Sequence, residues 1–509
     1  MNYTSQNPNL EKREAPLEIH GDEFRKLGHK LVDDIAEFFD GLSQRPVTVD
    51  ESPQTIRKLL GKDNLPEHGS PANELFDEAT DLLFGHSLFN GHPKFWGYIT
   101  SSAAPIGILA DLLAASVNPN VGAAALSPIA SEIEAQTIRW IADLIGYPRT
   151  CGGILVSGGN MANFTCFLAA RKTKATWKIH EEGLSANNQR MVVYVSKETH
   201  TWVDKATELF GLGAKSVRWI ETNADQQIDL DALEKQIIVD RSDGYYPFLV
   251  VGTAGTVSTG AVDPLPEIAA ICKKYDLWFH VDGAYGGPAA ALPNASSDLL
   301  GIRQADSIAL DPHKWLYSPL EAGCVLVRDP KHLVETFSHH PAYYSFDGVQ
   351  EDPPINYYEF GLQNSRGFRA LKVWLALRHV GRDGYIQMIG NDIALAQALY
   401  QVIGKYPELQ AVSQNLSITT FRFVPQNLPD ASTEVEVYLN ELNKKLDNRL
   451  QKSGEVFVSN ALIDGKYLLR ACIVNFRTSL SDIETLPEIV IGLGRKLDSE
   501  IRPKSLHSH

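Results

Sequence analysis

Residues 305–329 read ADSIALDPHKWLYSPLEAGCVLVRD, and this stretch decides both the fold and the chemistry that we expect of the chain. The apolar residues 308–310 predict a buried strand that ends at Asp311, and residues 324–327 predict a second strand. Lys314 therefore lies in the loop after a buried strand, between bulky neighbours. Burial disfavours the charged form of a lysine, so we expect its pKa to fall and its free amine to become available for Schiff-base chemistry.

A second apolar run, residues 277–281, is followed directly by Asp282 and then by small residues. An acid at the carboxyl end of a buried strand is a suitable partner for a cationic ring nitrogen. Pyridoxal phosphate (PLP) requires both groups, because a lysine binds its aldehyde carbon and an acid on the pyridinium nitrogen keeps the ring an electron sink. The spacing between Asp282 and Lys314 allows one helix or loop and a return to a neighbouring strand.

A third element, residues 154–160, reads ILVSGGN and predicts a strand, a glycine turn and the start of a helix. The unpaired N–H groups at the amino end of a helix bind phosphate, and Gly158 and Gly159 let the backbone approach closely. The side chains of Ser157 or Asn160 can add hydrogen bonds. The turn lacks the G-x-G-x-x-G spacing of a dinucleotide loop, which argues against a nicotinamide enzyme.

Together these motifs resemble the group II pyridoxal-phosphate-dependent decarboxylases, a family that includes aromatic-L-amino-acid decarboxylase and glutamate decarboxylase. The resemblance rests on SGGN at 157–160, a lone histidine in KETHTW, HVDGAYGG at 280–287 and DPHKWL at 311–316, and it extends from about Gly91 to Arg369. It implies an α/β fold of the PLP-dependent transferase-like class (aspartate aminotransferase fold type I). Such a fold has a large, mostly parallel sheet domain, a small C-terminal α+β domain and N-terminal helices.

The resemblance also implies roles for individual residues. Lys314 would be the Schiff-base lysine, Asp282 the partner of the pyridinium nitrogen, and His200 the ring that stacks on the cofactor. Further contacts with the cofactor are implied for Ser101, Gly158, Gly159, Asn160, Thr256, Ala284 and His313.

Two positions depart from the family pattern. Val257 stands where the family usually has a second threonine, which weakens the case for a threonine contact in this segment. Asp311 stands where the animal aromatic enzymes carry asparagine. An extra carboxylate near the phosphate must be compensated or must point away.

Residues 91–102, GHPKFWGYITSS, resemble the family segment that lines the substrate side chain. This would put Trp96 and Tyr98 against the substrate and Ser101 near the phosphate; the alternative is a core loop with buried rings. The aromatic cluster favours a substrate with an apolar, aromatic side chain. Lys94 or an arginine of a partner subunit would instead serve an acidic amino acid.

Residues 337–365 are polar, contain prolines and lack periodicity, which predicts a long loop of the kind that serves as a lid. Alignment on DPHKWL puts Tyr343 where the family's decarboxylases carry a catalytic tyrosine and the related aldehyde synthases carry phenylalanine. Tyr344 is the alternative in a register shifted by one. Arg366 and Arg369 open the next helix, and for them we expect surface or structural pairing.

Composition restricts the partners and the compartment. A net charge of −15 over 509 residues argues against nucleic acids and anionic membranes as partners. The five cysteines are scattered singly, which indicates buried thiols in a reducing compartment and no metal cluster. The polar amino terminus does not resemble a signal peptide and no apolar run is long enough to span a bilayer, so we expect a cytoplasmic protein.

We expect three parts: a helical segment at 1–90, a PLP-binding α/β domain at 91–380 and a small α+β domain at 381–509. By the family resemblance, the helical segment packs across a homodimer with active sites at the interface; packing on its own subunit is the alternative. The expected activity is PLP-dependent decarboxylation of an L-amino acid, with an aromatic one favoured, to an amine and CO2. The alternatives are a decarboxylation-dependent aldehyde synthase, a decarboxylase of an acidic amino acid, another PLP reaction such as transamination, and a non-enzymatic scaffold.

Overall fold

The computed structural model describes residues 15–62, 64–339 and 354–507, so Tyr343 and Tyr344 lie outside the described residues. The chain divides into two units, Met1–Phe89 and Asn90–His509. No helix within the described ranges is both long and apolar enough to cross a membrane.

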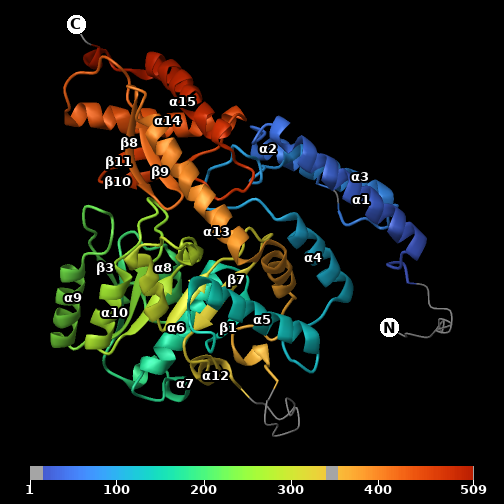
Figure 1. The fold of residues 1–509 in the computed structure, drawn as a ribbon, viewed down its shortest axis with the longest axis vertical. Helices are drawn as coiled ribbons and strands as arrows, with labels where there is room; N and C mark the ends of the chain where they lie inside the picture. The colour runs from blue at the N-terminus through green and yellow to red at the C-terminus, as the bar shows by residue number, and fades with distance from the viewer. Residues whose placement is uncertain (1–14, 63, 340–353, 508–509) are drawn as a thin grey trace. The chain divides into compact units, whose positions relative to one another are not determined.

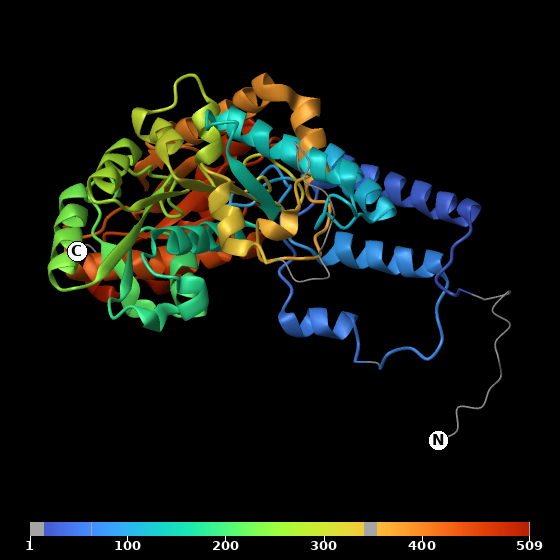
Figure 2. The ribbon, with the colours of Figure 1, turned by 90° about the horizontal axis from the view of Figure 1, so that it is seen from below.

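In its described residues the first unit contains the α-helices α1 (Gly21–Gly41), α2 (Pro53–Leu59) and α3 (Ala72–His86), and a short 3-10 helix, Leu42–Gln44, follows α1. α1 and α3 lie side by side (Figures 1 and 2), and the rings of Phe38 and Phe84 stack with centroids 4.4 Å apart. None of the residues in these three α-helices is buried. Apolar side chains such as Phe24 and Leu83 therefore stay exposed within this unit.

The second unit contains a seven-stranded sheet in the order β1-β7-β6-β5-β4-β2-β3. β7 runs antiparallel to both of its neighbours, whereas the other neighbouring strands are parallel, which confirms the predicted mostly parallel sheet. Every residue of β1, β2, β5, β6 and β7 is buried, as in sheets covered on both faces. The strands are β1 (Gly152–Val156), β2 (Met191–Ser196), β3 (Val217–Ile220), β4 (Tyr246–Thr253), β5 (Trp278–Asp282), β6 (Ser307–Leu310) and β7 (Gly323–Val327).

Helices connect and cover these strands. α6 packs along β6 and β7, and α10 packs against β4 and β5 (Figure 1). The helices of this part are α4 (Pro105–Val117), α5 (Pro128–Ile145), α6 (Gly159–Lys174), α7 (Ile179–Glu182), α8 (Trp202–Leu209), α9 (Leu230–Ser242), α10 (Leu265–Lys274), α11 (Ser297–Leu300) and α12 (Lys331–Phe337).

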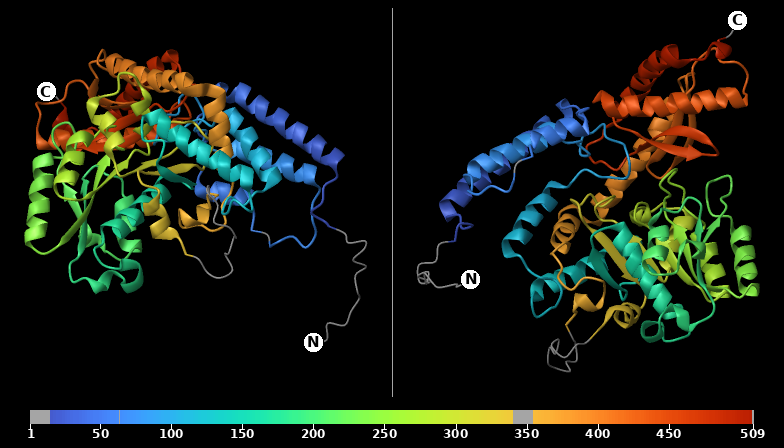
Figure 3. Two further views of the ribbon diagram at one scale, coloured as in Figure 1. Left: turned by 60° about the horizontal axis from the view of Figure 1, so that its bottom comes forward. Right: turned by 180° about the vertical axis from the view of Figure 1, so that it is seen from behind.

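The C-terminal part of the second unit is built on an antiparallel sheet in the order β10-β11-β9-β8. α14 and α15 lie beside this sheet (Figure 3), and the long helix α13 contacts both β8 and α15. α13 changes direction at Gly381, whose φ of 69° lies in the left-handed region. The elements are α13 (Ala370–Ile403), β8 (Leu409–Asn415), β9 (Ile418–Phe423), α14 (Thr433–Ser453), β10 (Ser459–Ile463), β11 (Lys466–Cys472) and α15 (Leu480–Ile501).

Candidate active site

A cavity of about 380 Å³ lies at the carboxyl ends of β1, β4, β5 and β6. Ligands of open α/β sheets gather at these strand ends, since loops leave the sheet there and helices begin. The cavity brings together most of the predicted cofactor residues, namely Gly158, Gly159, Asn160, His200, Asp282, Ala284 and Lys314. Its wall also includes residues that sequence reasoning did not select, among them Ile99, Met161, Asn163, Phe164, Glu198, Thr253 and Tyr285.

Lys314 follows β6 and is paired with a carboxylate of its own loop. Its Nζ atom lies 3.0 Å from Asp311 Oδ2. The positive charge of Lys314 therefore compensates the negative charge of Asp311, the extra carboxylate noted in the sequence. Burial lowers the pKa of Lys314, but the charge and hydrogen bond of Asp311 together with the charge of Asp282 outweigh it and raise that pKa. The predicted fall in the pKa of Lys314 is therefore wrong, because the neighbouring carboxylates favour the ammonium form.

Asp282 is the last residue of β5 and is held by two donors. Its Oδ2 atom accepts a hydrogen bond from Trp202 Nε1 at 2.9 Å, and its Oδ1 atom accepts one from the backbone N–H of Ala284 at 3.2 Å. Trp202 is fully buried at the start of α8. These donors fix the orientation of the carboxylate and stabilise its charge, as a partner for a pyridinium nitrogen requires.

Hydrogen bonds of a buried histidine, His280, support the end of β5 behind Asp282. His280 Nε2 and Asn163 Oδ1 are 2.7 Å apart, while His280 Nδ1 lies 2.9 Å from Ser307 Oγ. Burial lowers the pKa of His280 to about 4, so the ring is neutral at physiological pH. The imidazole therefore links α6, β5 and β6 behind the cavity without adding charge to it.

The glycine turn has the geometry of an anion cradle. Gly158 has a φ of +139°, which favours glycine, and it precedes the sixteen-residue helix α6. A Cβ atom on Gly159 would lie 2.6 Å from Asp311 Oδ2, so only glycine fits here without a shift. The first N–H groups of a helix lack intrahelical partners, and they suit the phosphate of PLP.

His200 faces the cavity from the loop before α8. Its Nδ1 atom accepts a hydrogen bond from the backbone N–H of Trp202 at 3.2 Å, which leaves the proton of the neutral ring on Nε2. Burial against its neighbours lowers the pKa of His200, even though the ring still reaches solvent through the cavity. A neutral imidazole over the cavity is compatible with the predicted stacking on a cofactor ring.

Three predicted cofactor residues lie behind the cavity wall instead of on it. His313 Nδ1 accepts a hydrogen bond from the backbone N–H of Ala322, and the carbonyl oxygen of His313 accepts one from Ser101 Oγ at 2.9 Å. Thr256 is fully buried, with its hydroxyl 2.9 Å from that of Thr259. These contacts support the loops, and Val257 is the neighbour of Thr256 that lines the cavity.

The two predicted substrate residues do not line this cavity either. Trp96 is fully buried in the hydrophobic cluster of the C-terminal part, and its Nε1 donates to Thr478 Oγ1 at 3.3 Å. Trp96 thus corresponds to the alternative expectation, a buried ring in a core loop. Tyr98 is 57% exposed and has a positive φ of 53°.

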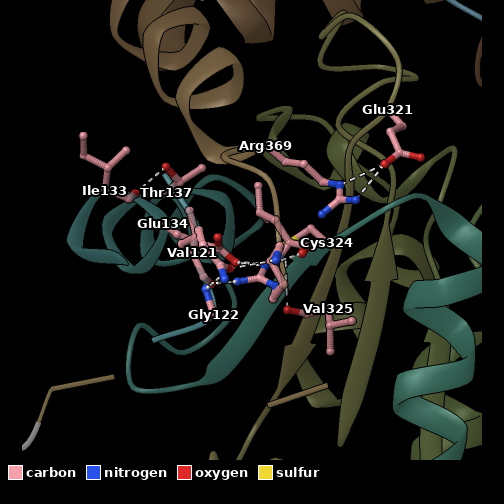
Figure 4. Close-up of polar contacts among 12 residues, drawn as sticks. Val121, Gly122, Ile133, Glu134, Thr137, Glu321, Cys324, Val325 and Arg369 are labelled. Carbon is pink, nitrogen blue, oxygen red and sulfur yellow. Dashed lines mark hydrogen bonds and ion pairs between the residues drawn. The ribbon is translucent and has the colours of Figure 1, made fainter. Parts of the chain in front are cut away.

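Arg366 and Arg369 make the structural ion pairs that we expected. Arg366 Nη2 lies 2.5 Å from Glu134 Oε1 and 2.6 Å from the carbonyl oxygen of Leu155, near the end of β1. Arg369 pairs with Glu321 at 2.8 Å, and Figure 4 shows these two side chains turned toward each other, apart from the group around Glu134. Neither arginine lines the cavity.

Lys314, Asp282 and the amino end of α6 meet at one cavity, and these are the groups that a PLP-dependent enzyme needs for its cofactor. Comparison with known proteins agrees. The model of the pyridoxal-dependent decarboxylase conserved domain matches residues 53–424. The chain belongs to this decarboxylase family, and it is therefore a PLP-dependent carboxy-lyase.

Similar proteins match along nearly the whole chain. Aromatic-L-amino-acid decarboxylase of Bacillus atrophaeus is 36% identical over 92% of this chain and 94% of its own length. Phenylacetaldehyde synthase of Petunia hybrida is 29% identical over 88% of this chain and 90% of its own length. A crystal structure of Oryza sativa TDC with PLP and tryptamine superposes with a TM-score of 0.88 at 26% identity, covering 95% of this chain and all of that chain.

Proposed function

We propose that this enzyme decarboxylates an aromatic L-amino acid to the corresponding amine and CO2. The observation that carries the proposal is the composition of the cavity wall beside Lys314 and Asp282, where Ile99, Phe164 and Val257 offer apolar surface. Among the described lining residues, the basic ones are Lys314 and His200, and Glu198 adds negative charge. This wall suits an apolar side chain and opposes an acidic one.

The names of the similar proteins support the same substrate class, since an aromatic-L-amino-acid decarboxylase is 36% identical. A panel of amino acids assayed for CO2 release tests the proposal. We expect turnover of tyrosine, tryptophan, phenylalanine or a hydroxylated relative, and little with glutamate, aspartate or cysteine sulfinate. Preferential release of CO2 from an acidic amino acid would contradict it.

Each part of the site has a proposed role toward the cofactor. When bound, PLP supplies an electron sink for the bonding electrons of the departing carboxylate. Lys314 binds the aldehyde carbon and Asp282 keeps a proton on the ring nitrogen. The backbone of residues 157–160 holds the phosphate, and His200 covers one face of the ring.

Aldehyde synthesis is the second candidate, because phenylacetaldehyde synthase of Petunia hybrida is among the similar proteins. Tyr343, which favours simple decarboxylation, lies outside the described residues. Assays for hydrogen peroxide and for amine in the same reaction separate the two candidates. We expect amine in an amount equal to the CO2 released, without peroxide.

We infer that the enzyme is a homodimer with its active sites near the interface. Two apolar surfaces support this inference. Phe24, Phe76 and Leu83 are exposed on α1 and α3 of the first unit, and Leu112 and Val117 are exposed on α4 of the second. We also infer a cytoplasmic location, since all five cysteines are free and four of them are buried. The mass of the holoenzyme in solution tests the dimer, and a monomeric mass would contradict it.

A further inference from the structure

Lys314 lies in a tight turn that also contains two buried aromatic residues, Trp315 and Tyr317. The backbone N–H of Tyr317 donates to the carbonyl oxygen of Lys314 at 3.1 Å, which closes the turn. Neither aromatic residue is among the described residues that line the cofactor cavity. Tyr317 has a φ of +54°, in the left-handed region that residues other than glycine seldom adopt. Contacts from outside the turn are needed to hold this backbone conformation.

A buried carboxylate on α13, that of Asp392, supplies such contacts. Its Oδ2 atom accepts hydrogen bonds from Trp315 Nε1 at 2.9 Å and from Tyr317 OH at 2.7 Å. The backbone N–H of Asn475, which follows β11, also donates to this carboxylate and stabilises its charge. Asp392 therefore holds the residues that follow Lys314 and connects them to the C-terminal part of the chain.

Trp315 also supports a residue of the cavity wall. The rings of Trp315 and Tyr285 stack with centroids 4.9 Å apart at an angle of 15°, and Tyr285 lines the cavity together with Lys314. The hydroxyl of Tyr285 lies 2.6 Å from Ser417 Oγ, which fixes the other end of this ring. A shift of the Trp315 indole would therefore disturb both the turn of Lys314 and the wall beside it.

The ionisation of Asp392 decides how many of its donors can be satisfied. A carboxylate only accepts hydrogen bonds, whereas a protonated carboxyl group accepts fewer and adds a donor of its own. Indole and backbone N–H groups cannot accept that proton. Burial raises the pKa of Asp392 to about 7, and the hydrogen bonds from Tyr317, Trp315 and Asn475 oppose this shift. The charged form, which matches the donors, is therefore the major one above about pH 7.

We propose that Asp392 is a positioning residue for Lys314, and that its carboxylate form holds the turn in the conformation that binds the cofactor. The neutral form makes fewer hydrogen bonds and holds the turn less firmly. Asp392 is not among the described residues that line the cavity, so it acts through Trp315 and Tyr317. This inference rests on the proposed role of Lys314 toward PLP.

Other titratable groups near Asp392 leave a clear pH window for testing this. From α13, the turn, the cavity wall and β11 the described ones are Tyr385, Tyr317, Tyr285 and Cys472. Burial raises the pKa of all four, that of Cys472 to about 11, so they stay uncharged up to about pH 9. Burial lowers the pKa of Lys314, but the neighbouring carboxylates raise it overall, so its amine keeps its charge in this range.

The first experiment compares wild type with Asp392→Asn in the binding of PLP to the full-length cofactor-free enzyme. The amide keeps the shape of the side chain but is neutral at every pH, so it mimics the protonated form. At about pH 5.5, where the carboxyl group of wild type is largely protonated, the two dissociation constants should be similar. At about pH 8.5 wild type should bind PLP about tenfold more tightly, the effect expected of a hydrogen bond to a charged acceptor.

The ratio of the two dissociation constants is the decisive quantity. Protons gained or lost by PLP and by Lys314 affect both proteins alike and cancel in this ratio. A side chain that merely stabilised the fold would change the affinity by the same factor at both pH values. A ratio that does not vary with pH would therefore overturn the inference.

Hydrogen exchange followed by mass spectrometry examines the turn without the cofactor. In the full-length cofactor-free enzyme at about pH 8.5, the amide of Tyr317 should exchange faster in Asp392→Asn than in wild type. Asp447→Asn is the matched control, since Asp447 is a buried carboxyl group of α14 that accepts a hydrogen bond from Tyr467 at 2.9 Å. This control should leave both the exchange of the turn and the ratio of dissociation constants as in wild type.

Equal exchange of the turn in wild type and Asp392→Asn would also overturn the inference while leaving the proposed function intact. If Asp392→Asn does not fold, Tyr317→Phe removes one donor and keeps the ring. Its loss of PLP affinity should be larger at about pH 8.5 than at about pH 5.5, and an equal loss overturns the inference. Failure of wild type to bind PLP at Lys314 would instead remove the proposed placement of the cofactor, and hydrogen exchange would still show whether Asp392 holds the turn.

Discussion

Glu134 of α5 and Arg366 form an ion pair in which both side chains are completely excluded from solvent. Arg366 also donates to the carbonyl oxygens of Val121 and Leu155, and Glu134 Oε1 accepts from the backbone N–H of Leu155. Leu155 lies two residues before the glycine turn. The pair therefore joins the segment before α13 to β1, the strand that leads into the glycine turn at 157–160.

Removal of one partner of this pair should destabilise the enzyme strongly, because the other charge stays buried and unpaired. We expect Arg366→Met to lower the free energy of unfolding by about 3–5 kcal/mol. Denaturant titration of the holoenzyme measures this. Arg369→Met is the matched control, since its partner Glu321 is 48% exposed, and it should cost less than about 1 kcal/mol. Equal losses for the two variants would contradict the account.

Trp202 should matter for catalysis through its hydrogen bond to Asp282. Trp202→Phe keeps an aromatic ring in the core but removes the donor, and a hydrogen bond to a charged acceptor contributes about 1.5–3 kcal/mol. We expect kcat to fall about tenfold to a hundredfold with a smaller change in KM. Trp278→Phe, which removes a donor to Ser307, is the control and should leave kcat nearly unchanged. Wild-type turnover of the Trp202 variant would argue against a role for this donor.

A buried carboxyl group of α13 should make stability depend on pH. Burial raises the pKa of Asp392 to about 7, although Tyr317 and Trp315 donate hydrogen bonds to its carboxylate. The folded enzyme then holds this proton at pH values where the unfolded chain has lost it, so stability falls as the pH rises from about 4 to about 7. Asp392→Asn should flatten the free energy of unfolding across this range. A slope unchanged from wild type would show that Asp392 does not titrate as described.

Tyr343 should decide which product is released. If it delivers the proton to the substrate carbon, Tyr343→Phe should shift the product from amine toward aldehyde, with ammonia and hydrogen peroxide formed at the expense of oxygen. Tyr344→Phe tests the alternative register and should leave the product unchanged. Amine and peroxide assays on the two variants measure the outcome. If both variants released amine as their sole product, neither tyrosine would be the proton donor.

Strand ends were the part of the site that the sequence could predict. Apolar runs followed by Asp282 or by the loop of Lys314 marked the ends of β5 and β6, and the parallel sheet brings such ends together. Contacts between segments that are far apart in the sequence could not be predicted from any such pattern. Trp202 reaches Asp282 across 80 positions of the chain, and nothing in its own surroundings in the sequence indicates this.

Two expectations failed for the same physical reason, the unknown direction of a side chain. The pKa of Lys314 was expected to fall with burial, but Asp311 turns its carboxylate toward the amine and reverses the shift. Trp96 was expected against the substrate, but its indole turns into the core of the C-terminal part, next to Thr478. Backbone position follows from periodicity, whereas side-chain orientation depends on partners far along the chain.

Reduction of the holoenzyme with borohydride, followed by proteolysis and mass spectrometry, tests the central claim most directly. We predict that the pyridoxyl group is found on Lys314, and that Lys314→Ala yields a protein that borohydride does not label. A pyridoxyl group on any other lysine, or none on the wild-type enzyme, would contradict the assignment of this cavity as the cofactor site.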